Sequence, residues 1–447
     1  MVFLDNIIYG EKSGYISTWN NLKEKAVIVD YIGHIEDQIS PSVYYEKGKH
    51  NLYQTMPSVG GVNLTDSCQL RCNYCAFSSG GCNKVTLQYE DVKAYIDFLF
   101  RNAKIKELTC GVFPFVSISF AGGGEPTFQW DLLQKSVDYI RKKARDKKIK
   151  TRLSITTNGV LNDEQIRYLG ENFDSIMVSY DGISTVQNEN RQGVKGTSTS
   201  GYVEHTVETL LKQNAYVIIR TTVWPNQYHM LKDMRNNIFR KFANIKSWEI
   251  NPVNYVGRAQ YTAPMDNPTL EFYKHFIELK QTSPEDICCR ISSAWFSKHN
   301  FFYVCGTAFG SYPWLNADGR IISCLDARDL SDVIGEIHGG RLQLNDFTDT
   351  ITECHINSMR ERCSQCIAFI HCGGGCPLKN NKARKMSKDE TYYSFIECEN
   401  KKQYWREIIK SAMKGKVLND MQLKKIDNVN GLNIFKLYAK GEENGDL

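Results

Sequence analysis

Three cysteines lie close together near residue 70. They are Cys68, Cys72 and Cys75, and their spacing is CxxxCxxC. Three thiolates in one loop can bind three irons of a cubane iron–sulfur cluster and leave the fourth iron open to an outside ligand. A structural zinc site would need a fourth protein ligand, and Cys82 keeps that alternative open.

A second series of cysteines follows in the C-terminal third of the chain. The chain has 15 cysteines and no N-terminal export signal, so we expect a cytoplasmic protein whose reduced thiols serve metal or redox chemistry. A zinc ribbon is the simpler alternative for this series, because it contains a CxxC pair. Its regularly spaced members are Cys305, Cys324, Cys363, Cys366, Cys372, Cys376 and Cys398.

Polar motifs follow several apolar segments between residues 120 and 191. They read FAGGGEPT at 120–127, TTNG at 156–159, VSYDG at 178–182 and NENRQG around Arg191. Groups at the C-terminal ends of successive parallel strands meet at one mouth of a barrel. We therefore expect these motifs to converge on the loop that carries the three cysteines.

The elements that must position these groups alternate along residues 60–252. Short β-branched segments alternate with stretches whose apolar residues recur at three and four, which predicts βα units around a parallel sheet. The predicted strands are 60–64, 116–120, 151–156, 175–179, 216–223 and 248–252, with a further strand candidate at 27–34. The predicted helices are 89–101, 130–143, 162–172, 202–214, 229–243 and 269–280. The sequence thus predicts an α/β fold with a partial (β/α)6 barrel.

The first cysteine cluster and the strand-end motifs together resemble the radical S-adenosylmethionine (SAM) superfamily. The resemblance implies a [4Fe–4S] cluster on Cys68, Cys72 and Cys75, with SAM on its open iron. Tyr74 would lie near the adenine, Glu125 and its glycines would bind the methionyl amine, and Arg191 would pair with the SAM carboxylate. The residues implied to bind this cofactor are Tyr74, Gly122, Gly123, Gly124, Glu125, Thr157, Asn158, Ser179, Asp181 and Arg191.

The second series resembles the SPASM domain, which implies two auxiliary [4Fe–4S] clusters. Cys363, Cys366, Cys372 and Cys398 would ligate the distal cluster, and Cys305, Cys324 and Cys376 the proximal one. A fourth proximal cysteine, expected soon after Cys305, is missing. Either Cys354, Cys288 or Cys289 replaces it, or one iron is open to a substrate atom such as a thiolate.

These resemblances imply an oxidoreductase that modifies a peptide. The leading hypothesis is a maturase that installs an intramolecular crosslink, thioether or carbon–carbon, in a ribosomally synthesised precursor peptide. It would need a low-potential electron donor of the flavodoxin or ferredoxin type. One alternative is an anaerobic sulfatase-type formylglycine maturase, and another is a zinc-stabilised, non-catalytic binding protein. Tyr255, Arg258, Trp314, Asp326 and His371 are candidates for contact with substrate.

Composition limits the remaining classes. The chain has 447 residues, of which 42% are hydrophobic, and a net charge of +5, which is too small to indicate a nucleic-acid or membrane partner. We expect four regions. They are an accessory region at 1–58, for which leader-peptide contact is one hypothesis, the barrel at 59–284, the SPASM domain at 285–400, and a helical tail at 401–447.

Overall fold

The computed structural model describes the barrel region almost throughout and the remainder in short pieces. The described residues are 2–4, 26–28, 57–80, 85–110, 113–262, 268–283, 287–288, 312–326, 333–344, 376, 398–400 and 402–403. Within them, an 11-stranded sheet has the order β13-β12-β11-β10-β3-β4-β5-β6-β7-β8-β9. A separate antiparallel pair joins β1 (Val2–Leu4) to β2 (Ala26–Ile28).

The central strands are parallel and follow one another in sequence order. They are β3 (Val59–Val62), β4 (Phe115–Phe120), β5 (Lys150–Thr157), β6 (Ser175–Ser179), β7 (Val217–Val223), β8 (Ser247–Pro252) and β9 (Ile287–Cys288). The six strands predicted within residues 60–252 are present, each within two residues of its expected ends. The candidate at 27–34 overlaps β2 at 27–28, and its remaining residues lie outside the described ones.

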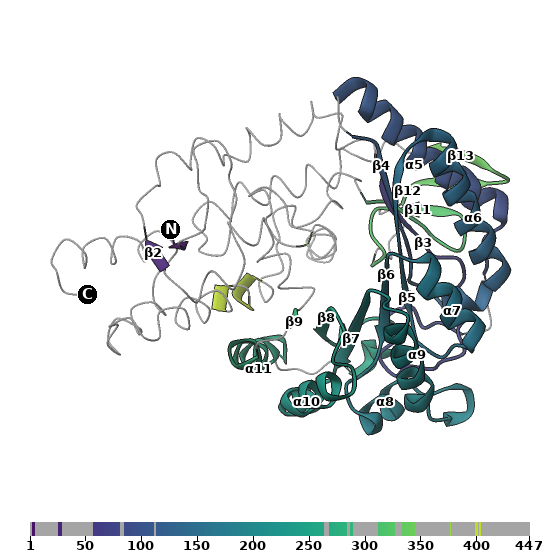
Figure 1. Ribbon diagram of the computed structural model, residues 1–447. Helices are drawn as coiled ribbons and strands as arrows, with labels where there is room; N and C mark the ends of the chain where they lie inside the picture. The colour runs from purple at the N-terminus through teal and green to yellow at the C-terminus, as the bar shows by residue number, and fades with distance from the viewer. Residues whose placement is uncertain are drawn as a thin grey trace.

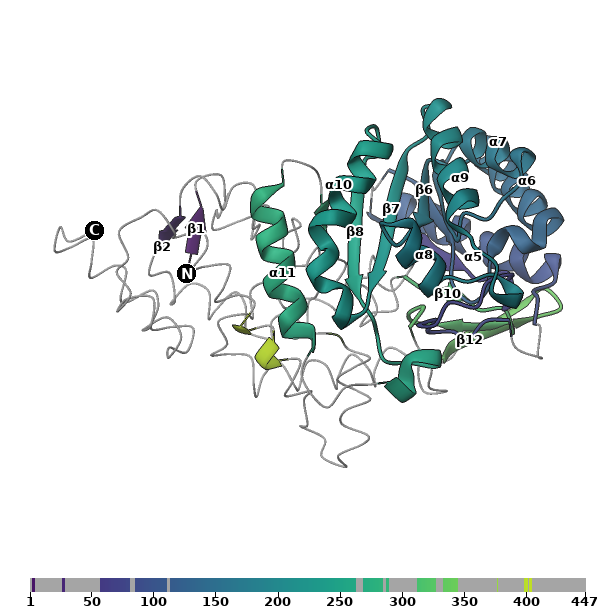
Figure 2. The same cartoon turned by 90° about the horizontal axis from the view of Figure 1, so that it is seen from below.

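Helices connect these strands and cover one face of the sheet, as Figures 1 and 2 show. They are α5 (Tyr89–Cys110), α6 (Trp130–Lys147), α7 (Asp163–Asn172), α8 (Ser184–Asn190), α9 (Ser200–Lys212), α10 (Leu231–Lys241) and α11 (Pro268–Thr282). Short 3-10 turns cover Pro126–Gln129, Val194–Gly196, Pro225–Met230 and Gly257–Thr262. No helix in the described part of the chain is long and apolar enough to cross a membrane.

Local sequence explains where these helices begin and end. A capping box starts α7: the Asn162 side chain accepts from the Gln165 amide, and the Gln165 side chain accepts from the Asn162 amide. Helix α6 ends with two basic residues, Arg145 and Lys147, which favour the negative end of a helix dipole. The basic residues of the sequence around 141–147 therefore belong to this helix end.

The two faces of the sheet differ in chemistry. On β4 and β5, the fully buried residues Val116, Ile118, Leu153 and Ile155 face the helices and join the main core. Apart from Phe115 at the start of β4, the alternate positions on these strands are polar and only partly buried or exposed. Because side chains alternate across a strand, each strand offers an apolar outer face and a polar inner face.

A hairpin extends the sheet beyond β3. Strand β10 (Trp314–Leu315) runs parallel to β3 and antiparallel to β11 (Arg320–Ile322), and β12 (Val333–His338) and β13 (Arg341–Leu344) complete this edge. Gly319 has a φ of +84° in the turn between β10 and β11, a conformation that favours glycine. The sheet is therefore continuous between the predicted barrel and the start of the predicted SPASM domain.

Candidate active site

The loop that carries the three cysteines follows β3 directly and is held from across the barrel. Arg258, in the turn after β8, donates from its amide to the Cys75 carbonyl at 3.0 Å. Its guanidinium donates to the Cys72 carbonyl at 2.8 Å and to the Ser79 carbonyl at 3.0 Å. Arg258 was a candidate for contact with substrate, but here its hydrogen bonds position the cysteine loop.

Burial keeps two of the thiols protonated in the absence of metal. It raises the pKa of Cys68 to about 12 and that of Cys72 to about 11. The Cys68 sulfur accepts from the Leu70 amide at 3.4 Å and from Asn158 Nδ2 at 3.7 Å. Because metals bind thiolates, loading the loop must release protons, and these N–H groups stabilise the resulting charge on sulfur.

Three thiols in one loop are the donor set of a cubane cluster with one open iron, whereas a structural zinc site needs a fourth protein ligand. Cys82, the fourth ligand of the zinc alternative, lies outside the described residues. The donor set therefore fits the [4Fe–4S] cluster.

The glycine motif after β4 lies against the cysteine loop. Gly124 donates to the Thr65 carbonyl at 2.7 Å, and Glu125 donates to the Ser67 carbonyl at 2.8 Å. A Cβ on Gly124 would come within 1.9 Å of the Ser67 carbonyl oxygen, so only glycine fits there. Gly122 and Gly123 precede it, both with positive φ. These contacts bring the glycine motif and the three cysteines together, as the sequence predicted.

The Glu125 carboxylate links two strand ends. It accepts from Thr127 Oγ1 and Thr157 Oγ1, both at 2.8 Å, and from the Asn158 amide at 2.7 Å. Burial raises its pKa, and the hydrogen bonds from Asn158, Thr157 and Thr127 oppose that shift. The carboxylate was expected to bind the methionyl amine. In this structure it holds the end of β5 in place, and thereby holds Asn158 beside Cys68.

Asp181, after β6, is a second buried carboxylate with several partners. It is fully buried and accepts from Arg191 Nε at 3.0 Å, from Asn190 Nδ2 at 3.1 Å and from the Thr222 amide at 3.1 Å. The Tyr74 hydroxyl also donates to it. Asp181 therefore connects the cysteine loop, the segment after α8 and the end of β7.

The Arg191 guanidinium has hydrogen-bond donors that no described residue accepts. Its Nε is used by Asp181, whose charge raises the Arg191 pKa although burial alone would lower it. Its two terminal nitrogens donate no hydrogen bond to any described residue, and the guanidinium lies 5.2 Å from the centre of the Tyr74 ring. Arg191 could therefore still bind a carboxylate, as the sequence prediction requires, while Tyr74 packs against it.

The remaining predicted residues lie at neighbouring strand ends. Thr157 is the last residue of β5 and Asn158 follows it, and Ser179 is the last residue of β6, two positions before Asp181. All three side chains are buried, and Ser179 Oγ has no hydrogen-bond partner among the described residues. The residues predicted to bind SAM thus gather at the carboxyl edge of β4, β5 and β6, beside the cysteine loop.

Cys324, one of the predicted cysteines of the second series, lies next in sequence to a residue that packs on the glycine motif of this site. Cys324 follows β11, and its sulfur accepts from the Asp326 amide at 3.4 Å. The next residue, Leu325, packs with Ala121 and Trp314, and a Cβ on Gly122 would come within 2.2 Å of its side chain. Cys376 and Cys398 are described as partly buried. Cys305, Cys363, Cys366 and Cys372 lie outside the described residues, as does His371.

Sequence analysis missed several polar residues that support this site. Gln227 and Asn190 exchange hydrogen bonds at 3.2 and 3.3 Å. Gln187 Oε1 accepts from the Asp181 amide at 2.9 Å, and Trp224 Nε1 donates to Asn73 at 3.0 Å. The available signal was weak: the WPNQ segment gives β7 a polar end like those of β5 and β6.

Comparison with protein families identifies the central part of the chain. Residues 62–236 match the model of the Radical SAM superfamily. The cysteine-type anaerobic sulfatase-maturating enzyme of Clostridium perfringens is 23% identical over 359 residues, which cover 76% of this chain and 93% of that enzyme.

Solved structures share the fold. Native anSMEcpe with bound AdoMet has a TM-score of 0.60 at 20% identity, covering 79% of this chain and 99% of that one. Streptococcus suis SuiB bound to its precursor peptide SuiA has a TM-score of 0.54 at 13% identity, covering 83% of this chain and 82% of that one. The family match and the shared fold confirm the predicted fold class, a radical SAM partial barrel followed by a SPASM domain.

Proposed function

Because residues 62–236 place this chain in the radical SAM superfamily, we propose that it oxidises a side chain of a peptide substrate and installs an intramolecular crosslink. The family implies a [4Fe–4S] cluster and SAM, which when bound and reduced supply a 5′-deoxyadenosyl radical that abstracts a substrate hydrogen atom. Loss of a second electron and a proton would then complete a two-electron oxidation.

The convergence of the cysteine loop with the ends of β4, β5 and β6 carries this proposal. Cys68, Cys72 and Cys75 would hold the cluster, and Asn158 donates toward the Cys68 sulfur at 3.7 Å. Arg191, with two terminal nitrogens that donate to no described residue, would pair with the SAM carboxylate. The buried carboxylates Glu125 and Asp181 would keep these groups in position, since each bridges segments distant in sequence.

The C-terminal cysteines support the oxidative part of the proposal. Cys324 lies beside the glycine motif through the packing of Leu325, so an auxiliary cluster that includes it would lie near the SAM site. Such a cluster would accept the electron released when the substrate radical closes to a bond. The missing fourth cysteine of the proximal set favours an iron open to a substrate thiolate, and hence a thioether.

A second candidate is formylglycine formation. It is favoured by the similarity to the sulfatase-maturating enzyme of Clostridium perfringens, which extends over 93% of that enzyme. Both reactions would begin with abstraction of a hydrogen atom from a peptide side chain. They differ in the later steps, because a thioether retains the cysteine sulfur, whereas formylglycine formation from cysteine exchanges sulfur for oxygen.

Anaerobic mass spectrometry separates these outcomes. The reconstituted enzyme, SAM and a strong reductant are incubated with the cysteine-containing peptide encoded beside the gene, and separately with a sulfatase peptide. Loss of two hydrogens and of one alkylatable thiol per link from the neighbouring peptide would support crosslinking. Exchange of sulfur for oxygen in the sulfatase peptide would support formylglycine formation. Formation of 5′-deoxyadenosine with neither peptide changed would contradict both assignments for these substrates.

A further inference from the structure

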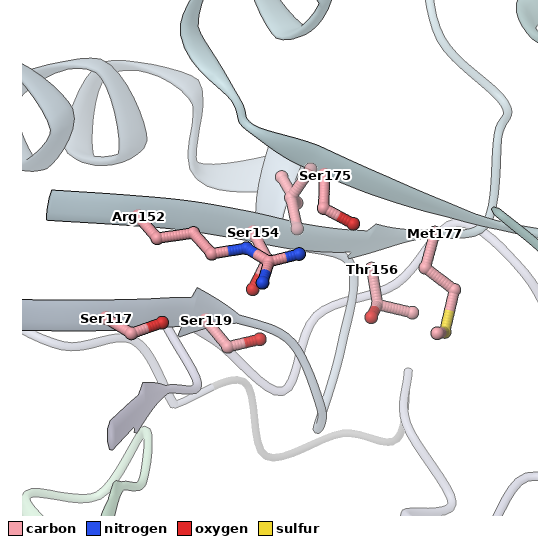
Figure 3. Close-up of a pocket in the computed structure, with 8 residues that line it drawn as sticks. Ser117, Ser119, Arg152, Ser154, Thr156, Ser175 and Met177 are labelled. Carbon is pink, nitrogen blue, oxygen red and sulfur yellow. The ribbon is translucent and has the colours of Figure 1, made fainter. Parts of the chain in front are cut away.

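A cavity of about 270 Å³ lies on the inner face of the sheet, over β4, β5 and β6. Figure 3 shows the labelled side chains of these strands projecting to the same side. The polar part of the lining consists of Ser117, Ser119, Arg152, Ser154, Thr156 and Ser175, and Met177 is also in contact with the cavity. No aspartate or glutamate is among the described lining residues. This lining is therefore rich in hydroxyl groups and has one formal positive charge.

Strand register places three of the hydroxyl groups in one row. Ser119 of β4 is paired with Ser154 of β5, which is paired with Ser175 of β6. Neighbouring strands lie about 4.8 Å apart, so the row extends across roughly 10 Å. Arg152 precedes this row on β5 and Thr156 follows it, on the same face of the strand. The row and Arg152 thus form one continuous polar surface.

These polar groups have no partners in the described part of the protein. Neither the hydroxyls of Ser119, Ser154, Ser175 and Thr156 nor the Arg152 guanidinium forms a hydrogen bond or ion pair with another residue that the structure describes. Arg152 is exposed, and Ser119, Ser154 and Thr156 are partly buried, so water can reach these groups. Thr157, the next residue on β5, is buried and instead donates to Glu125. The cavity therefore presents polar groups that a ligand could bind in place of water.

The cavity reaches the candidate active site along β5. Thr156 lines its upper end and is followed by Thr157 and Asn158, and Asn158 donates toward the Cys68 sulfur. Arg152 lies four residues earlier, which at about 3.3 Å per residue places it roughly 13 Å below Thr156. A molecule in the cavity would thus extend from the reacting end of the barrel toward Arg152.

We propose that this cavity binds a carboxylate of the peptide substrate, with Arg152 as its charged partner and the serine row as further hydrogen-bond donors. A guanidinium binds a carboxylate through two parallel hydrogen bonds, and its charge selects against neutral and cationic groups. The volume corresponds to about nine water molecules at about 30 Å³ each, which accommodates one acidic side chain or one terminal residue. This inference rests on the proposed function, because it assigns part of the peptide substrate.

Direct binding to the reconstituted holoenzyme tests the site without any turnover. The probes are acetyl-glutamate amide, with a side-chain carboxylate, acetyl-alanine, with a C-terminal carboxylate, and the neutral acetyl-glutamine amide. Acetyl-lysine amide is the cationic probe. Saturation-transfer NMR gives their relative affinities. We expect one carboxylate probe to bind at least about tenfold more tightly than the neutral probe, because hydrogen bonds to a charged group are strong. The better carboxylate probe identifies the source.

Variants show whether Arg152 is responsible. Arg152→Glu should remove the carboxylate preference and favour the lysine probe, and Ser154→Ala should weaken carboxylate binding about tenfold. Arg145→Glu is the matched control, because Arg145 is an arginine on the last turn of α6, on the helical side of the sheet. Iron content and melting temperature confirm that each variant is folded and loaded.

The outcomes separate this inference from the proposed function. If Arg152→Glu binds the carboxylate probes as the unmodified protein does, or if no probe is preferred, the inference is wrong even where peptide oxidation is observed. If the preference depends on Arg152 and no peptide is oxidised, the carboxylate site is retained and the proposed reaction fails.

Discussion

Thr156 and Thr157 are adjacent on β5, yet they belong to two regions that differ in how their polar side chains are hydrogen-bonded. Thr157 is buried and donates to the Glu125 carboxylate at 2.8 Å, within the network at the mouth of the barrel. Thr156 lines the inner cavity and has no hydrogen-bond partner among the described residues. The mouth uses its polar groups to hold its own strand ends in place, whereas the cavity leaves them available.

This contrast indicates that the mouth positions the catalytic groups and the cavity binds substrate. Rigid positioning of catalytic groups requires that the supporting side chains be fixed by packing and hydrogen bonds. A site that must accept different parts of a substrate needs polar groups that are not already satisfied. Substitutions at the barrel mouth should therefore have large effects on cluster content or stability where a cluster ligand or buried charge is lost. Loss of a single hydroxyl should have a smaller effect on stability.

Cys72→Ala should abolish the cluster at the barrel mouth. The loop would keep two thiols, too few to hold a cubane with one open iron, so we expect a loss of about four irons per chain. Iron analysis and the formation of 5′-deoxyadenosine under anaerobic reducing conditions measure the effect. Full iron content together with normal SAM cleavage in this variant would contradict the assignment of the loop.

Asp181→Ala should destabilise the protein strongly. It would leave the buried Arg191 without its charge partner, and removing one member of a buried pair costs about 3–5 kcal/mol. Thermal melting of the anaerobically purified protein measures the change. Asp163→Ala is the control, because the Asp163–His205 pair is exposed and should contribute at most about 1 kcal/mol. Equal melting temperatures for the two variants would refute the role of Asp181 in the network.

Arg258→Met should weaken retention of the cluster while leaving its ligands intact. The substitution removes the donors to the Cys72 and Ser79 carbonyls, and the loss of such supporting bonds typically costs about 10–100-fold in metal affinity or activity. Chelator-induced loss of iron, followed by absorbance, measures the effect. Arg240→Met, near the C-terminal end of α10, should behave like the unmodified protein.

The two threonines provide the most sensitive comparison. Thr157→Val would remove a hydrogen bond from the buried Glu125 carboxylate and should cost about 1–3 kcal/mol. Thr156→Val removes a hydroxyl that has no partner among the described residues, and the change in stability should stay within about 0.5 kcal/mol. Thermal melting of both variants under identical conditions checks this difference. A larger cost for Thr156→Val would show that its hydroxyl is bound within the protein.

Much of the fold and part of the site could be predicted from local sequence. Strands β3 to β8 and most of their helices follow from hydrophobic periodicity, which reports on neighbours in the chain. Helix α8 was not predicted, and α5 ends at Cys110 rather than at the predicted 101. Gly124 and Glu125 could be assigned to the cysteine loop because parallel strands end at one edge. The spacing of Cys68, Cys72 and Cys75 predicted a metal site, since ligands so close in sequence can meet in space. The strand-end motifs were needed to favour a cluster over zinc.

Only the tertiary structure determined which side chains contact one another across the barrel. Arg258 reaches the Cys72 carbonyl although 186 positions separate them. The row of Ser119, Ser154 and Ser175 depends on the register of three strands, which periodicity within each strand does not specify. Glu125 and Asp181 have partners on several elements because a buried carboxylate is unfavourable unless hydrogen-bond donors surround it. Such contacts are set by packing of the whole barrel, so local sequence carries little record of them.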